Sequence, residues 1–469
     1  MGRFFKRFLA FFAVLSLVGQ GCTTIPSGDA QRAAQPATLN VWGVVDDIDA
    51  YSQVFADYRV AHPNVTFIYK RFRLEEYEDE LLNALAEDRG PDIFMIHNTW
   101  TGEYMSKINP MPRQTKTAHR VLSSGLKKEL TWELQTEPTI SLNEFKNQFA
   151  DVVQNDILRT INVSTNPDTK DFQQRPMGVP VGIDTLALYY NKDILNAAGI
   201  PTPPENWTQF ADQVKRITKI DTAGDLQQTA AGIGTATNVD RATDILTILM
   251  IQNGQVMADD AGYPQFNRIP AALSGVRESP PSYQALEFYT DFANPNKETY
   301  TWNENQPNSI DAFVQGRTAF FFGYAYHYDT IRARAPKLNM AISQLPQIEG
   351  NPTRNFANYW YFAVAKKSKH QDLAWNFLNS LTQADAAKKV LTAARRPAAR
   401  KSLLGDQLND ERVGVFASQV LTATSWYRGT NATAMERALS DMISDVITGT
   451  RPINQAVRFA NDTIAQTIQ

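Results

Sequence analysis

The chain has 469 residues, a hydrophobic content of 43%, a charged content of 20% and a formal net charge of −3. This length is enough for two or three domains, and the composition is ordinary for a globular protein. A mildly acidic chain argues against nucleic acid as the main partner. The single cysteine excludes an intrachain disulfide.

The first residues have the pattern of an export signal. Three basic residues precede a short apolar run over 8–18, and small residues then lead to Cys22. The run is too short for a comfortable membrane span, so we predict a signal peptide over 1–21. We expect Cys22 to carry a lipid that anchors the mature protein outside the cytoplasm, followed by a flexible tether over 22–37. A free or buried thiol is the alternative, and Gly19 stands where the lipidation motif usually has leucine.

Strands and helices alternate after the tether. The expected order is a strand over 39–45, a helix ending at Pro63, a strand over 64–72, a helix over 74–89 and a strand over 93–97. The strands alternate or are uniformly apolar, and the helices have apolar residues at helical spacing. This β-α-β-α-β order predicts an α/β fold with a parallel sheet covered by helices.

Further elements follow with less regularity. We expect helices over 140–153, 205–218, 240–253, 282–293 and 368–382, a loop over 163–174, and buried strands over 186–190, 319–324 and 357–364. In the helix over 368–382, Ser368 is the expected N-cap. Its core side is expected to carry Ala374, Phe377, Leu378 and Leu381.

Several stretches carry a resemblance to a known family. They include "FADYRVAHPNV", "YEDELLNALAEDRGPDIFMIHNTW", "LALYYNKDILNAAGIPTPPENWTQF", "FVQGRTAFFFG" and "VAKKSKHQDLAWNFLNSLT". In these segments and in their order, the chain resembles extracytoplasmic solute-binding proteins of bacterial ABC importers, in the sugar-binding, maltose-binding-like group. The region 111–176 does not share the resemblance.

The resemblance implies a type II periplasmic-binding-protein fold, with two α/β lobes joined by a hinge. Lobe 1 is expected to comprise 38–183 and 311–366, and lobe 2 to comprise 184–310 and 367–469. Asp184 would then lie where the chain first crosses between the lobes, facing the cleft.

Ligands of open α/β sheets bind beyond the carboxyl ends of the strands. Sugars need flat aromatic rings for their C–H faces and polar side chains for their hydroxyls. Residues of these kinds at strand ends and hinge segments are the candidate ligand-binding set: Trp42, Asp47, Asn98, Thr99, Asp184, Tyr326, Trp360, Arg396 and Trp426. Trp207 and Trp375 fall on helix positions typical of the core and are excluded.

Structural roles are the alternatives for several of these residues. They are core packing for Trp42, helix capping for Asp47, Asn98 and Thr99, and a loop salt-bridge network for Arg396. The histidines have no metal-ligand spacing, so no metal and no cofactor are expected.

The implied function is capture of a mono- or oligosaccharide by hinge closure and delivery to a membrane permease, by a monomer. One alternative keeps the fold but binds a polyamine, a peptide or a polyol phosphate. Another is a surface-tethered glycosidase, which needs two carboxylates flanking the bond. Asp46 and Asp47 are adjacent in sequence and would point apart on a strand, so we expect no enzyme activity.

Overall fold

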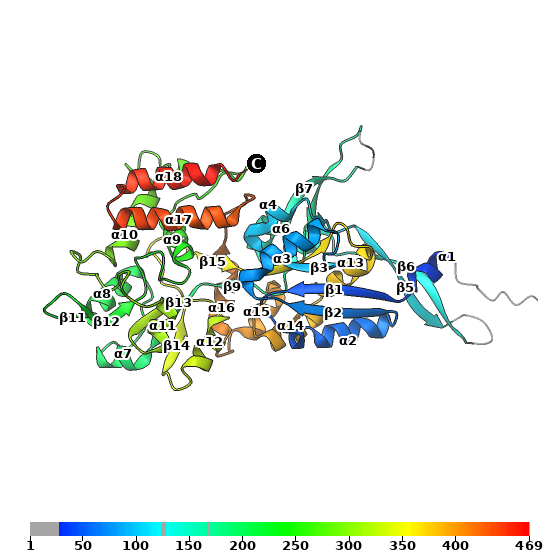
Figure 1. The fold of residues 1–469 in the computed structure, drawn as a ribbon, viewed down its shortest axis with the longest axis horizontal. Helices are drawn as coiled ribbons and strands as arrows, with labels where there is room; N and C mark the ends of the chain where they lie inside the picture. The colour runs from blue at the N-terminus through cyan, green and yellow to red at the C-terminus, as the bar shows by residue number, and fades with distance from the viewer. Residues whose placement is uncertain (1–27, 123–127, 165, 167, 469) are drawn as a thin grey trace, which may run out of the picture.

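A computed structural model describes residues 28–122, 128–164, 166 and 168–468 of the chain. Two α/β lobes lie end to end along the longest axis of the molecule (Figure 1). The predicted signal peptide over 1–21 and the predicted lipid site Cys22 lie outside the described residues. No helix in the described part of the chain is long and apolar enough to cross a membrane.

The first lobe is built on a five-stranded sheet in the order β2-β1-β3-β16-β4. Its strands are β1 (Ala37–Gly43), β2 (Val65–Arg71), β3 (Ile93–His97), β4 (Ile108–Asn109) and β16 (Trp360–Ala365). β1 pairs in parallel with both β2 and β3, which confirms the predicted β-α-β-α-β unit, while β16 is antiparallel to β3. The carboxyl ends of β1, β2 and β3 therefore meet at one edge of the sheet.

Helices from two distant parts of the chain cover this sheet. They are α2 (Ser52–Ala61), α3 (Leu74–Ala86), α4 (Thr101–Tyr104), α5 (Leu142–Gln148), α6 (Asp151–Ile157), α13 (Gln371–Ser380), α14 (Ala384–Ala394) and α15 (Lys401–Gln407). The predicted apolar face of the helix that is now α13 is buried in the core of this lobe. Ser368 does not cap α13: its hydroxyl donates to Asp92 (2.6 Å) and accepts from the His370 N–H (3.0 Å).

The second lobe has a mixed sheet in the order β11-β12-β13-β10-β14. Its strands are β10 (Ala187–Asn191), β11 (Lys219–Ile220), β12 (Leu226–Ala231), β13 (Thr318–Gly323) and β14 (Met340–Ser343). Its helices are α7 (Lys192–Ala197), α8 (Trp207–Ile217), α9 (Ala242–Gln252), α10 (Pro281–Asp291), α11 (Ser309–Val314), α12 (His327–Arg334), α17 (Ala432–Ile447) and α18 (Ile453–Ala465). Trp207 packs in the core of this lobe and Trp375 in that of the first lobe, as predicted.

Three chain segments join the lobes. They form a small sheet in the order β17-β15-β9, made of β9 (Asp184–Thr185), β15 (Asn355–Asn358) and β17 (Ala423–Thr424), beside α16 (Gly414–Gln419). The hydrophobic core changes from one lobe to the other within two residues at β9, where Ile183 belongs to the first core and Leu186 to the second. Such short segments are typical hinges between packed domains.

The predicted division of the chain between the lobes is wrong in two places. The segment 311–366 was expected in lobe 1, but β13 pairs with β10 and β12 in the second sheet. The segment 367–469 was expected in lobe 2, but α13, α14 and α15 pack on the first core. The reason is long-range pairing: β13 finds its hydrogen-bond partners in the second sheet, and only β16, after the second crossing, returns to the first.

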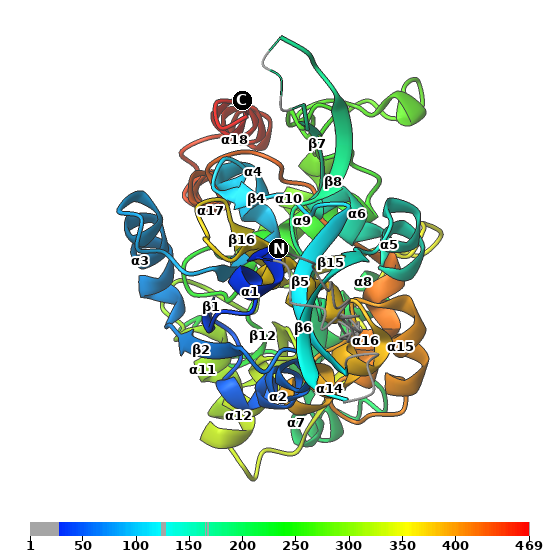
Figure 2. The same cartoon turned by 90° about the vertical axis from the view of Figure 1, so that its right-hand side faces the viewer.

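The predicted tether and the predicted loop over 163–174 also differ from the structure. Residues 28–33 form helix α1 (Gly28–Ala33), and the Asn64 side chain donates to the carbonyls of Ala33 and Gln35 (both 3.2 Å). The helix lies against a long hairpin at the end of the molecule that faces the viewer in Figure 2, formed by β5 (Gln114–Leu122) and β6 (Leu130–Pro138). The last three residues of the expected loop over 163–174 belong instead to strand β8 (Phe172–Pro176), which pairs with β7 (Leu158–Asn162) in a second hairpin.

Candidate functional site

A cleft of about 1180 Å³ lies between the two lobes. From the first lobe it is lined by the carboxyl ends of β1 and β3, by α3 and by α14; from the second lobe it is lined by residues of α12 and α17 and by Arg241. Hinge residues, among them Asp184 and Asn358, form part of its wall. The position agrees with the rule that ligands bind beyond the carboxyl ends of parallel strands.

Aromatic rings form one wall of the cleft. Trp360, the first residue of β16, packs edge-on against Trp100, with ring centroids 5.1 Å apart and planes at 76°. His97 and Tyr77 lie on other sides of the same indole, at 5.4 and 6.0 Å. Trp360 and Trp100 are each only partly buried, so ring surface remains open to the cleft.

The second lobe contributes one flat ring, that of Tyr326. It stacks on Tyr324 with centroids 5.7 Å apart and an interplanar angle of 18°. The Tyr324 hydroxyl donates to Asp244 (2.6 Å), which holds this pair of rings in place. The cleft therefore has apolar ring surface on both of its sides.

Asp184 lies at the first crossing between the lobes and lines the cleft, as predicted. Its carboxylate accepts from the backbone N–H groups of Thr185 (3.0 Å), Ala325 (2.9 Å) and Tyr326 (3.4 Å). Burial raises the pKa of Asp184 to about 6, against the opposing effect of Arg396 and these N–H donors. The side chain thus ties the hinge strand to the start of α12.

Arg396 reaches the cleft from the loop after α14. Its guanidinium forms an ion pair with Asp46 (3.2 Å), which lies in the loop after β1. Burial disfavours the charge on Arg396, but attraction to Asp46 and Asp184 outweighs it and raises the pKa. Lys401, five residues further on, does not line the cleft and pairs with Asp151 (2.8 Å).

Asp47 and Thr99 also line the cleft. Asp47 pairs with Arg71 (2.7 Å) and is largely exposed, and its side chain makes no capping hydrogen bond to the short helix that follows. The Thr99 hydroxyl hydrogen-bonds to His97 Nδ1 (2.7 Å), while His97 Nε2 contacts Asn358 Oδ1 (3.2 Å). Burial and then Arg241 lower the pKa of His97 to about 4, so the ring is neutral near pH 7.

Three predicted site residues do not line this cleft. Trp42, on the inner strand β1, packs against Phe72, with ring centroids 4.5 Å apart, and is partly buried against the first core. Asn98 is buried and its amide donates to Asp156 (3.0 Å), because it points away from the cleft where its neighbour Thr99 points into it. Trp426 is buried against Phe266 in the second lobe and lines only a minor cavity of about 20 Å³.

The sequence reasoning missed an ionic cluster on the second lobe. Arg241 precedes α9 in a left-handed conformation (φ +57°) and forms a two-pronged pair with Asp244, at 2.7 and 2.9 Å. Its Nη2 lies 3.5 Å from Glu436, on α17. No local sequence signal marks this cluster, because Glu436 is brought to Arg241 only by the packing of α17 on α9.

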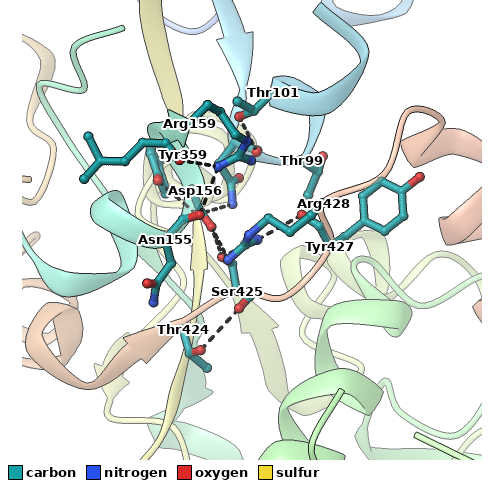
Figure 3. A network of polar contacts seen from close by, with 12 residues as sticks. Thr99, Thr101, Asn155, Asp156, Arg159, Tyr359, Thr424, Ser425, Tyr427 and Arg428 are labelled. Atoms are coloured by element: carbon teal, nitrogen blue, oxygen red, sulfur yellow. Dashed lines mark hydrogen bonds and ion pairs between the residues drawn. The ribbon is translucent and has the colours of Figure 1, made fainter. Parts of the chain in front are cut away.

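A buried polar network lies beside the hinge (Figure 3). Its centre is Asp156 on α6, which is fully buried. The carboxylate accepts from the side chains of Asn98 (3.0 Å), Tyr359 (2.9 Å) and Ser425, and pairs with Arg428 (2.8 Å). Asp156 belongs to the first lobe and Arg428 to the segment that enters the second, so the network links the lobes at the third crossing.

The arrangement suits binding of a solute, with apolar rings, hydroxyls and charged groups around an open cleft. Within the described part of the chain, no group of three or more His, Cys, Asp or Glu side chains is placed to hold a metal ion.

Comparison with known proteins gives a family for the chain. Residues 137–388, more than half of the chain, match the family model described as bacterial extracellular solute-binding protein. Binding proteins of Brucella abortus (strain 2308) and Brucella suis biovar 1 (strain 1330) are each 21% identical over 336 residues, covering 65% of this chain and 76% of theirs.

Solved structures of sugar-binding proteins share the fold. A cyclo/maltodextrin-binding protein complexed with maltotetraose has a TM-score of 0.67 at 17% identity, over 93% of this chain and 98% of that one. The sugar-binding protein MalE from Xanthomonas citri also has a TM-score of 0.67 at 17% identity, over 92% and 97%. A solute-binding protein of Thermotoga lettingae TMO bound with α-D-tagatose has a TM-score of 0.64 at 18% identity, over 92% and 100%.

Proposed function

Because the chain belongs to the bacterial extracellular solute-binding protein family, a family of binding proteins and not of enzymes, we propose that it captures a carbohydrate in the cleft between its lobes. The bound sugar would then be delivered to the membrane permease of an ABC importer. The observation that carries the proposal is the exposed ring surface of Trp360 and Trp100 on one lobe and Tyr326 on the other, with polar side chains between them.

Carbohydrate chemistry fits this lining. The C–H face of a pyranose packs on a flat aromatic ring, and vicinal hydroxyls both donate and accept hydrogen bonds. Asp47, Thr99, Asp184 and Arg396 supply carboxylate, hydroxyl and guanidinium groups within the same cleft. The structural neighbours described above, with tagatose and maltotetraose among their ligands, support the same class of solute.

Capture works by hinge closure. A ligand that contacts both lobes binds the closed state more tightly than the open state and shifts the population toward it. The short crossings at β9, β15 and β17 allow this rotation without disturbing either core. The closed form is then the one that docks on the permease.

The N-terminal sequence supports a location outside the cytoplasm. The export signal over 1–21 and lipid on Cys22 would hold the protein as a monomer on the outer side of the cell membrane. This anchor is part of the proposal.

A thermal-shift screen of the purified protein tests the proposal. The panel contains mono- and oligosaccharides, polyamines, amino acids, peptides and polyol phosphates. A ligand that binds only the native state raises the melting temperature by mass action. We expect a carbohydrate to raise the melting temperature. A rise with a non-sugar solute alone would be consistent with the fold but would overturn the proposal of a carbohydrate ligand.

A further inference from the structure

The charge of the cleft narrows the class of its ligand. Building on the carbohydrate function proposed above, we infer that the preferred saccharide carries amino groups and binds as a cation. The site is the cleft itself, and its ionisable lining decides the charge of the occupant. Nine carboxylates and four guanidiniums line it, and no lysine is among the described lining residues.

The four arginines that line the cleft are already paired with carboxylates of the protein. Each forms an ion pair with a carboxylate of the protein: Arg71 with Asp47 (2.7 Å), Arg73 with Glu76 (3.0 Å), Arg241 with Asp244 (2.7 Å) and Arg396 with Asp46 (3.2 Å). An anionic ligand would have to break one of these pairs to gain a counter-charge. A phosphorylated or carboxylated sugar is therefore disfavoured.

Carboxylates without such a partner remain on the first lobe. Glu75, Glu78 and Asp79 lie on α3 and line the cleft. No ion pair within the described part of the chain joins any of the three to a basic side chain. Glu78 is partly buried, so its charge is only partly screened by water.

A carboxylate of the second lobe lines the same cleft. Glu436 on α17 has only a 3.5 Å contact with Arg241, whose stronger, two-pronged partner is Asp244. Burial raises the pKa of Glu78, and repulsion from Glu103, Asp79 and Glu436 adds to the rise. The cleft thus has a carboxylate of like charge on each lobe, Glu78 on the first and Glu436 on the second.

The like charges on the two lobes link ligand charge to closure. Closing the cleft brings like charges of the two lobes nearer, and a cation placed between them removes that cost. An ammonium group also makes charge-assisted hydrogen bonds to carboxylates and favourable contacts with the faces of Trp360 and Trp100. A pyranose ring that carries ammonium groups uses both the rings and the carboxylates.

Calorimetric titration with three tetrasaccharides tests the inference. They are the tetramer of glucosamine, the tetramer of N-acetylglucosamine and maltotetraose, in a mildly acidic, low-salt buffer in which the free amines are protonated. We expect the glucosamine tetramer to bind at least about tenfold more tightly than either neutral tetramer, and this preference to shrink as salt is added.

Two substitutions locate the effect. Glu78→Gln and Glu436→Gln should each reduce the preference for the glucosamine tetramer severalfold while keeping the wild-type circular dichroism spectrum. The control is Glu287→Gln, an exposed carboxylate on α10 outside the cleft lining, which should keep the full preference.

The outcomes separate this inference from the proposed function. This test uses only the wild-type protein. If a neutral tetramer binds as tightly as the glucosamine tetramer or more tightly, the inference of a cationic saccharide is overturned and the proposed carbohydrate function is not. Binding of spermidine with no binding of any saccharide overturns both, as does the absence of any saccharide binding across the thermal-shift panel.

Discussion

The carboxylate of Asp184 is placed where the chain leaves the first lobe, and it binds three backbone N–H groups rather than a side chain. Two of these donors, at Ala325 and Tyr326, lie about 140 residues further along the chain. The position of Asp184 at the cleft was predicted from the resemblance to the solute-binding family, which places the first crossing between the lobes at this residue. Its partners could not be predicted, because they depend on the turn between β13 and α12.

At Trp360 we expect a binding defect. Trp360→Ala removes the central ring of the aromatic wall and should weaken saccharide binding by about 1–2 kcal/mol, roughly a tenfold rise in the dissociation constant. Titration calorimetry measures the change. The control is Trp42→Ala, which removes a ring of the same lobe that does not line the cleft. A loss of affinity only in Trp42→Ala would contradict the assignment.

His327 should make the fold sensitive to acid. Burial and then Arg241 lower its pKa from 6.5 to about 3, and its Nδ1 accepts from the Tyr324 N–H (2.9 Å). The unfolded chain takes up a proton near pH 6.5 and the folded chain does not, so stability present above pH 6.5 is lost as the pH falls. The loss approaches about 1.4 kcal/mol per pH unit.

Urea unfolding of wild type and His327→Asn at several pH values isolates this contribution, because asparagine keeps an acceptor without titrating. The raised pKa of Asp184 acts in the opposite direction over about pH 4–6 in both proteins and cancels from the difference. Parallel pH profiles for the two proteins would show that His327 has no such role.

At the scale of elements, helix α6 carries two ion pairs of very different burial. Asp156 is fully buried against Arg428, whereas Asp151 is exposed and pairs with Lys401 (2.8 Å). Asp156→Asn removes the counter-charge of Arg428 and places an amide among donors, which should lower the free energy of unfolding by about 3 kcal/mol. Asp151→Asn, on the same helix, should cost about 0–1 kcal/mol. Equal costs in urea unfolding would contradict a buried link at the hinge.

The sequence predicted individual elements better than their partners. The strand that became β3 was predicted at its observed bounds, and the apolar faces of α3 and α13 were read from helical spacing. β13 and β16 are both short and almost wholly buried, so their patterns hold no information about which sheet each one joins. That choice is made by long-range pairing, and the predicted lobe boundaries failed there.

In the candidate site too, residues placed by local features were predicted, whereas those placed by long-range packing were not. Asp47, Thr99, Asp184, Tyr326, Trp360 and Arg396 line the cleft. All but Arg396, which lies in the loop after α14, lie near strand ends or in hinge segments, and strand ends are local features of the sequence. Arg241 and Glu436 were missed because helix packing brings them together. The prediction for Asn98 was wrong, because its side chain points away from the cleft to Asp156 while that of its neighbour Thr99 lines the cleft.

At the scale of the whole molecule, the proposed function requires that a saccharide binds between the lobes and closes them. Small-angle X-ray scattering tests it most directly, with the purified protein measured alone and saturated with the saccharide that raises its melting temperature most. We expect a smaller radius of gyration at saturation, with no change in molecular mass. An unchanged radius at full saturation would contradict closure of the lobes around the ligand.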